Sequence, residues 1–178
     1  MYKAGLDLKV FLSLSQKVVM IEILSADGST PREAGTWMLA NEASIFRTIG
    51  GGELENMALD KARQLIKSQS PSSIDMQIPL GPEIGQCCGG QVRLRIALLD
   101  RQGKQQCHKR IEQEIADLND VYIFGAGHMG KALCDALSLL PTNPIVVDTR
   151  EQALSDIREC IETRLSAMPE QEIRSAKQ

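Results

Sequence analysis

Two adjacent cysteines lie in the polar, glycine-rich stretch GPEIGQCCGG at residues 81–90. Neighbouring Cα atoms are only about 3.8 Å apart across a trans peptide, so Cys87 and Cys88 could form a disulfide with each other only through a strained ring. Reduced, they present two soft donors on a backbone whose glycines let a ligand approach, and nearby amides stabilise the reactive thiolate. An inert structural pair is the alternative, but the surrounding Gly and Gln residues offer no apolar packing to explain it.

The segment TIGGGELE at residues 48–55 could bind an anion. Gly50, Gly51 and Gly52 precede an expected helix, and the first amides of a helix have no partner within it. Glu53 and Glu55 occupy the same helix start, where they would repel a phosphate unless they face away. A plain turn between a strand and a helix is therefore the alternative.

The loop SADGSTPREAG at residues 25–35 adds polar groups that could serve the same anion. Ser29 and Thr30 supply hydroxyls, and Arg32 supplies a cation. If this loop meets the glycine segment in space, Arg32 and the glycine amides together could hold a phosphate.

A third glycine-rich segment, GAGHMG at residues 125–130, follows an expected strand and opens an expected helix. Asp148 ends the next strand, 23 residues after Gly125. This spacing suits a dinucleotide, with phosphates on the helix amides and a ribose hydroxyl on the acid. Gly125, Gly127, Gly130 and Asp148 are therefore candidate ligands. The alternative is that the glycines only permit close packing of strand and helix.

Two further side chains could extend this dinucleotide site. His128, at the helix N-terminus, could contact an anionic ligand, and Arg150 could meet a 2′-phosphate. Each is alternatively a polar residue in contact with solvent.

The composition fits a globular protein and excludes several other classes. Of the 178 residues, 43% are apolar and 24% are charged, and the net charge of -3 does not point to nucleic acid as a partner. No apolar run reaches the roughly 20 residues that span a bilayer, and the N-terminus lacks the pattern of a secretory signal, so we expect a cytoplasmic protein. The odd number of cysteines indicates free thiols. These are Cys87, Cys88, Cys107, Cys134 and Cys160.

The patterns up to residue 104 predict an α+β domain with an antiparallel meander. Helical spacing occurs at 6–16, and a clear helix is expected at 53–66, with its acidic residues first and basic residues later. The expected strands are VVMIEIL (18–24), TWMLAN (36–41), ASIFRTIG (43–50), SSIDMQIPL (72–80) and QVRLRIALL (91–99).

A charged connector at 100–120, with a helix in its second half, leads to a strand–helix–strand–helix pattern that starts at Val121. Such alternation predicts a partial, Rossmann-like doubly wound unit. The expected elements are a strand at 121–124, a helix at 128–140, a strand at 143–148, a second helix at 151–160 and at most one more strand near 160–167. The predicted domains are 1–104, a helical linker at 105–119, and 120–178.

Taken together, these segments resemble the xanthine dehydrogenase accessory factor family (XdhC/CoxI). The resemblance rests on GSTPREAG (28–35), IGGGELE (49–55), LGPEIGQCCGG (80–90), and FGAGHMG (124–130) with VVDTR (146–150), in the order of the family. Family members usually continue well beyond the point that corresponds to Gln178, so the resemblance is to a C-terminally short version.

The resemblance implies a chaperone for the molybdenum cofactor rather than an enzyme. Members bind molybdopterin cofactor, support its sulfuration with a cysteine desulfurase as the sulfur source, and deliver it to the molybdenum-binding subunit of xanthine dehydrogenase. Soft thiolates suit molybdenum and can accept a persulfide sulfur. The resemblance implies that Cys87 and Cys88 lie at the metal or handle the sulfur, with Gln86 orienting them beside Gly89 and Gly90.

The remaining N-terminal motifs would hold the rest of the cofactor. Arg32 and the glycines at 50–52 would bind the pterin phosphate, with Ser29 nearby, and a glutamate such as Glu53 could meet the N–H edge of the pterin. An NAD(P)-binding oxidoreductase fragment is the alternative function, and a non-catalytic fragment is a third. An incomplete sheet leaves a pairing edge, so we also expect a homodimer.

Overall fold

The computed structural model describes residues 4–68, 72–82, 89–159 and 161–175. Contacts within the chain divide it into two compact units. The N-terminal unit is Leu8–Gln105, and the C-terminal unit is Gln106–Gln178 together with Met1–Asp7. The predicted domains and linker remain a prediction. Helix α3 (Arg101–Ala116) runs across the division between the units.

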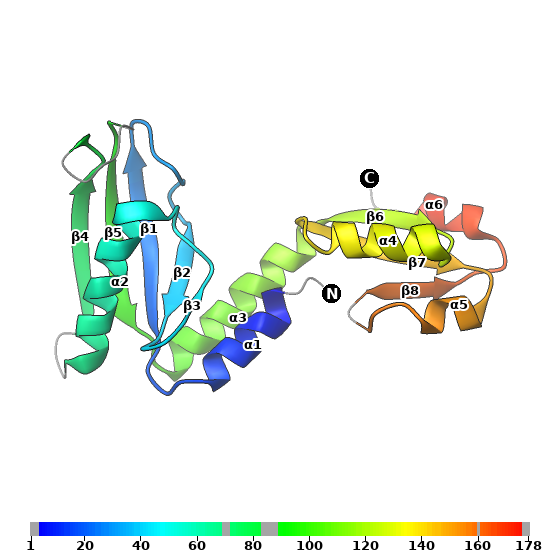
Figure 1. The fold of residues 1–178 in the computed structure, drawn as a ribbon, viewed down its shortest axis with the longest axis horizontal. Helices are drawn as coiled ribbons and strands as arrows, with labels where there is room; N and C mark the ends of the chain where they lie inside the picture. The colour runs from blue at the N-terminus through cyan, green and yellow to red at the C-terminus, as the bar shows by residue number, and fades with distance from the viewer. Residues whose placement is uncertain (1–3, 69–71, 83–88, 160, 176–178) are drawn as a thin grey trace. The chain divides into compact units, whose positions relative to one another are not determined.

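The N-terminal unit contains a five-stranded antiparallel sheet in the order β3-β2-β1-β5-β4 (Figure 1). Its first three strands form the predicted meander, and the next two form a hairpin. The strands are β1 (Val19–Asp27), β2 (Trp37–Ala40), β3 (Ile45–Phe46), β4 (Ser73–Pro79) and β5 (Gln91–Leu98).

Helix α2 (Gly52–Lys67) covers one face of this sheet, over β1, β2 and β5 (Figure 1). Its buried residues recur at helical spacing, and the sheet offers alternate residues such as Ile21 and Leu94 to the same core. Burial of these side chains is the main force that holds the helix on the sheet. On α2 they are Leu54, Ala58, Leu59, Ala62, Leu65 and Ile66.

The opposite face of the sheet carries an aromatic cluster near β2 and β3. Helix α1 (Ala4–Ser13) contributes Phe11, whose ring lies 5.9 Å from that of Phe46. Trp37 lies 6.0 Å from Phe46, and the guanidinium of Arg47 lies 4.6 Å from the Trp37 ring. All four residues of β2 are buried because it is covered on both faces.

Strand β1 changes register against β5 between Ile23 and Ser25. Before the shift, the odd-numbered residues face the α2 core; after it, Ala26 packs against that core. This β-bulge therefore reverses which residues of β1 point inward just before the strand ends at Asp27.

The C-terminal unit contains a parallel three-stranded sheet in the order β6-β7-β8 (Figure 1). Helices α4 and α5 connect successive strands and form a small core with them. The elements are β6 (Asn119–Phe124), α4 (His128–Leu137), β7 (Thr142–Asp148), α5 (Glu151–Ser155) and β8 (Glu162–Leu165), followed by a 3-10 turn (Pro169–Gln171) and α6 (Glu172–Ser175).

The predicted fold class is confirmed, with two corrections to its helices. The connector was expected to be helical only in its second half, but α3 begins at Arg101 because the Asp100 carboxylate accepts the Gly103 amide at 2.7 Å. Helix α5 was expected to reach residue 160 but ends at Ser155. The Ser155 hydroxyl bonds back to the Gln152 carbonyl, a local bond that competes with the helix.

Candidate functional site

Three loops meet at one end of the N-terminal sheet: the loop after β1, the glycine turn before α2, and the β4–β5 hairpin. A methyl group placed on Gly50 would lie 3.1 Å from the Pro31 ring and 3.5 Å from Cγ of Arg32. One placed on Gly90 would lie 2.3 Å from the Ser29 carbonyl oxygen. The contact between the first two loops, which was a condition of the predicted phosphate site, is therefore met.

The β4–β5 hairpin has well-defined ends. Leu80 is fully buried, and its amide donates to the Gly90 carbonyl oxygen at 2.7 Å while its own carbonyl accepts from the Gly89 amide at 2.8 Å. Gly89 has φ 70°, a backbone conformation that favours glycine. The predicted ligands Gln86, Cys87 and Cys88 lie outside the described residues, and Cys88 directly precedes Gly89 in the chain.

The glycine turn carries its own carboxylate. Oε2 of Glu55 accepts hydrogen bonds from the Ile49 and Gly51 amides, each at 3.1 Å, and from the Thr48 hydroxyl. The Gly50 amide donates to the Thr48 hydroxyl oxygen at 3.0 Å. Glu55 therefore does not face away from the turn, and the Gly51 amide, a predicted phosphate donor, already has an acceptor.

The other predicted side chains of this site are exposed. Arg32, Glu53 and Ser29 all face solvent. Within the part of the chain that the structure describes, neither Arg32 nor Glu53 makes a side-chain hydrogen bond or an ion pair. Beside them, the Thr30 hydroxyl donates to the Arg32 carbonyl at 3.0 Å, which shapes the loop. Arg32 is thus available to an anionic ligand.

The glycine turn of the C-terminal unit also binds a carboxylate. Asp148, 5% exposed, accepts the Ala126 amide at 2.7 Å on one oxygen and the Arg150 amide at 2.9 Å on the other. The Arg150 guanidinium forms two more bonds to it, each of 3.0 Å. Together these bonds hold the pKa of Asp148 well below its usual range. The bonds from the Arg150 side chain contribute most, and the bond from the Ala126 amide comes next.

The three glycines of this turn have different roles. Gly125 has φ 105°, and a methyl group on Gly130 would lie 1.9 Å from the Gly125 carbonyl oxygen, so this pair permits close packing of helix and strand. Gly127 has an ordinary backbone, with φ −75°, and a methyl group placed on it would meet no atom within 4 Å. Close packing therefore explains Gly130, the positive φ explains Gly125, and neither explains Gly127. His128 is exposed at the start of α4.

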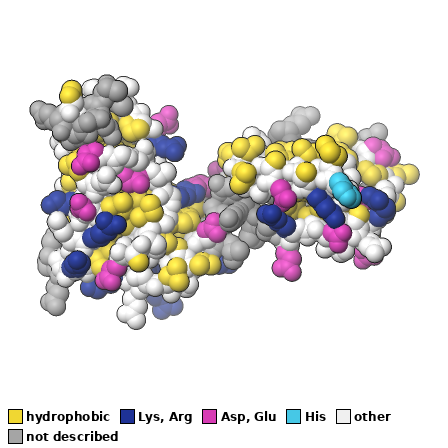
Figure 2. All heavy atoms as spheres, in the orientation of Figure 1, with side chains coloured by type: hydrophobic (Ala, Val, Ile, Leu, Met, Phe, Trp, Pro, Cys, Tyr) yellow, Lys and Arg dark blue, Asp and Glu magenta, His cyan; other side chains and the backbone are white. Residues whose placement is uncertain are grey.

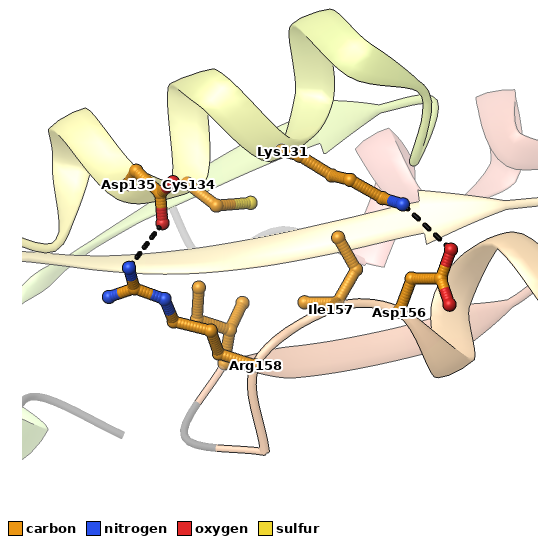
Figure 3. Close-up of a pocket in the computed structure, with 7 residues that line it drawn as sticks. Lys131, Cys134, Asp135, Asp156, Ile157 and Arg158 are labelled. Atoms are coloured by element: carbon orange, nitrogen blue, oxygen red, sulfur yellow. Dashed lines mark hydrogen bonds and ion pairs between the residues drawn. The ribbon is translucent and has the colours of Figure 1, made fainter.

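A separate cavity of about 150 Å³ lies between α4 and the segment that follows α5 (Figure 3). Ion pairs cross it from Lys131 to Asp156 at 2.8 Å and from Arg158 to Asp135 at 3.0 Å. Cys134 lines it, and burial raises the pKa of this thiol, as expected for a residue that fills the core. None of the predicted site residues lines this cavity.

The described residues offer neither a metal cluster nor a membrane span. Among them, no group of three or more His, Cys, Asp or Glu side chains could hold a metal ion. None of the described helices is both long and apolar enough to cross a membrane.

Sequence reasoning missed Glu55 as a residue that organises the site. It was considered only as a charge that would repel a phosphate. Its position four residues after Gly51, in the first turn of the helix, was the available signal, because an acid there can reach back to the amides before the helix.

Known proteins match this chain in sequence and in fold. Residues 12–76 match the XdhC and CoxI family. The uncharacterized protein YqeB of Escherichia coli strain K12 is 23% identical over 138 residues, 76% of this chain and 23% of that protein, so this chain spans less than a quarter of that relative's length. The crystal structure of a xanthine dehydrogenase from Bacillus halodurans shares the fold, with a TM-score of 0.76, 17% identity, and coverage of 96% of this chain and 70% of that one. The resemblance inferred from the motifs is thereby confirmed: this chain is related to the XdhC and CoxI family.

Proposed function

We propose that this chain is an accessory factor for the maturation of xanthine dehydrogenase. It binds molybdopterin cofactor as cargo, supports its sulfuration with sulfur from a cysteine desulfurase, and passes it to the molybdenum-binding subunit of the enzyme in the cytoplasm. The family match supports this proposal, since it includes the loop at 28–35 and the glycine turn.

One observation carries the proposal: the three motif loops meet at one end of the sheet. Arg32 is an exposed cation beside Gly50, and the same loop packs against Gly90. A cation for the phosphate of the cargo therefore lies on the loop that packs against Gly90, and Cys88 precedes Gly90 by two residues in the sequence. We propose that Cys87 and Cys88 supply soft sulfur for its molybdenum.

The test is titration of the purified chain with molybdopterin cofactor. We expect the double variant Cys87→Ser/Cys88→Ser to lose most of the affinity, and Arg32→Ala to weaken binding by about tenfold, since one charge-assisted contact is removed. Arg63→Ala is the matched control, because Arg63 is an exposed arginine on α2 in the same unit. Unchanged affinity in the double variant would defeat the proposed role of the thiols.

A second candidate function is dinucleotide binding by the C-terminal unit, and Gly127 is the observation in its favour. This glycine stands at the N-cap of α4 with open space around it, where a phosphate could approach. A ribose hydroxyl would have to replace a bond that Asp148 makes to Arg150 or Ala126. Calorimetry with NADH and NADPH tests this function, and the absence of heat with both would remove it.

We also propose that the C-terminal unit associates with a second copy of itself. Helix α4 buries Cys134 on one side but exposes Met129 (76%) and Leu133 (47%) on another, and Leu139 and Leu140 continue this apolar surface (Figure 2). Exposed apolar side chains that gather in this way are typical of interfaces. We expect sedimentation to show a dimer that Leu133→Glu dissociates, and a folded monomer of the unmodified chain at micromolar concentration would contradict the proposal.

A further inference from the structure

The Glu55 carboxylate, rather than a ligand, occupies the donors of the N-terminal glycine turn. One oxygen takes the Ile49 amide, the Gly51 amide and the Thr48 hydroxyl. A carboxylate that accepts several donors at once forms charge-assisted bonds, which are stronger than bonds between neutral groups. The turn therefore has the form of an anion site whose anion belongs to the chain itself.

The backbone of this turn needs such a restraint. Gly50, Gly51 and Gly52 have φ of 129°, 77° and 65°, in the region that glycine visits freely and other residues rarely adopt. Three successive glycines have a wide choice of conformations before folding, and a fixed set of bonds is needed to select one. Glu55 supplies these bonds from the rigid first turns of α2.

The position of the glycine turn also determines where the neighbouring loop lies. Gly50 packs against Pro31 and against the side-chain stem of Arg32. Elsewhere on the same loop, Gly28 would place a methyl group 3.2 Å from Cα of Gly90. Contacts thus run without interruption from Glu55, through the glycine turn, to the loop that carries Arg32 and to the end of the β4–β5 hairpin.

We propose that Glu55 is a positioning residue: it takes the Ile49 and Gly51 amides, the second of which was a predicted phosphate donor, and so fixes the loop on which Arg32 meets the anionic ligand. The nature of the ligand, a phosphate-bearing pterin, rests on the proposed function, whereas the fixing of the loop does not. Glu55 excludes a phosphate from the Ile49 and Gly51 amides, since two negative groups on the same donors repel each other.

The opposite arrangement makes the opposite prediction. If a ligand phosphate displaced Glu55 and took the turn amides, the carboxylate would act as a competitor, and its removal would tighten binding. If Glu55 positions the loop, its removal weakens binding. The sign of the change in affinity therefore distinguishes the two arrangements.

Amide hydrogen exchange of the full chain, without ligand, tests the fixing of the loop. In Glu55→Ala we expect exchange to rise about tenfold both at 48–52 and at 28–34, the second segment being remote in sequence from the substitution. Glu55→Gln keeps one acceptor oxygen and should restore part of the protection. Glu53→Ala, an exposed acid of the same helical turn, should change neither segment. Unchanged exchange in the core of α2 checks that the unit remains folded.

A rise confined to 48–52, with 28–34 unchanged, would overturn the positioning role. Titration with molybdopterin cofactor then tests whether the fixed loop contributes to ligand binding. We expect Glu55→Ala to weaken binding by about tenfold, as Arg32→Ala does. Tighter binding by Glu55→Ala would overturn the proposal in favour of competition. If the unmodified chain does not bind molybdopterin cofactor, the proposed function and the proposed role of Glu55 in ligand binding are both wrong. The exchange result would still show whether Glu55 fixes the loop.

Discussion

The two units each contain a glycine turn that binds a carboxylate of its own chain, but the acids come from different places. In the N-terminal unit, Glu55 lies four residues after Gly51 and belongs to the helix that the turn opens. In the C-terminal unit, Asp148 lies 22 residues after Ala126, at the end of the next strand. The first turn can form with its own helix, whereas the second requires β6 and β7 to be assembled.

The surroundings of the two acids also differ. Glu55 is half-buried, and its partners among the described residues are donors of its own turn, whereas Asp148 is buried and is shared between the Ala126 amide and Arg150. Glycine spacing thus predicts the backbone conformation of a turn, and the acid that the fold brings to the turn decides what occupies its donors. Substitutions within one turn should therefore affect that turn and leave the other intact.

Gly130→Ala should have the largest effect. Its methyl group would lie 1.9 Å from the Gly125 carbonyl oxygen, and backbone cannot move aside as a side chain can. We expect a loss of more than about 3 kcal/mol in the stability of the C-terminal unit. Gly127→Ala, where the space is open, should cost less than about 1 kcal/mol. Hydrogen exchange at 142–148 measures both, and equal protection in the two variants would contradict the packing role of Gly130.

Gly90→Ala should destabilise the N-terminal unit in the same way, because the added methyl group would clash with backbone. A methyl group there would lie 2.3 Å from the Ser29 oxygen and 2.7 Å from the Asp27 oxygen, so we expect a loss of about 2–3 kcal/mol. Gly81→Ala, which has open space around it, is the control. Fluorescence of Trp37, the one tryptophan of the sequence, follows urea unfolding of this unit. A Gly90→Ala chain as stable as the control would show that the loops do not pack as described.

Acid should weaken the C-terminal turn through Asp148. Because the folded-state pKa of this carboxyl is depressed, its stabilising contribution is complete above the ordinary carboxyl range near pH 4, and is lost as pH falls toward the folded pKa. Asp148→Asn should be less stable at pH 7 and lose less on acidification from pH 5 to pH 2. Hydrogen exchange at 142–148, corrected for the intrinsic pH dependence, measures this difference. Parallel acid profiles of variant and unmodified chain would assign the acid sensitivity to other groups.

Thr48→Val should have the smallest effect of the four. It removes the hydroxyl that donates to Glu55 and accepts from Gly50, but leaves both amide bonds to the carboxylate, so we expect a cost of about 1 kcal/mol. Trp37 fluorescence in urea measures the change. Thr163→Val, an exposed threonine of β8 in the other unit, should leave this transition where it is. A larger loss in Thr48→Val than in Gly90→Ala would reverse the proposed order.

Much of the fold could be predicted because the spacing of hydrophobic residues in the sequence indicates the type of each element. The alternation in β5 and the helical spacing of α2 each show which side must be buried, whatever the rest of the chain does. The start of α3 was predicted wrongly because the charged composition of residues 100–120 was interpreted as an exposed connector. The signal for the helix start was local: the Asp100 carboxylate caps the helix by accepting the Gly103 amide.

The proximity of some segments of the candidate site was predictable, but the hydrogen bonds of their side chains were not. The spacing of Gly125 and Asp148 correctly indicated proximity, since the Asp148 carboxylate contacts the Ala126 amide. The sequence could not reveal that Arg150 and Glu55 would use these groups within the chain, because several donors and acceptors lie within reach and the folded geometry selects among them. The roles of Cys87 and Cys88 remain predictions.

The extra residue in β1 sets a constraint on how this protein can change over evolutionary time. Removing one residue between Ile23 and Ser25 would remove the bulge and the local bend that it gives β1, although Ala26 and Asp27 would keep their partners Val92 and Gln91 in β5. The chain beyond Asp27 would then leave the strand in a different direction. Selection should therefore tolerate exchanges of one β-branched residue for another in this strand far better than a gap. Homologues that keep this loop should therefore conserve the number of residues in β1 more strictly than their identity.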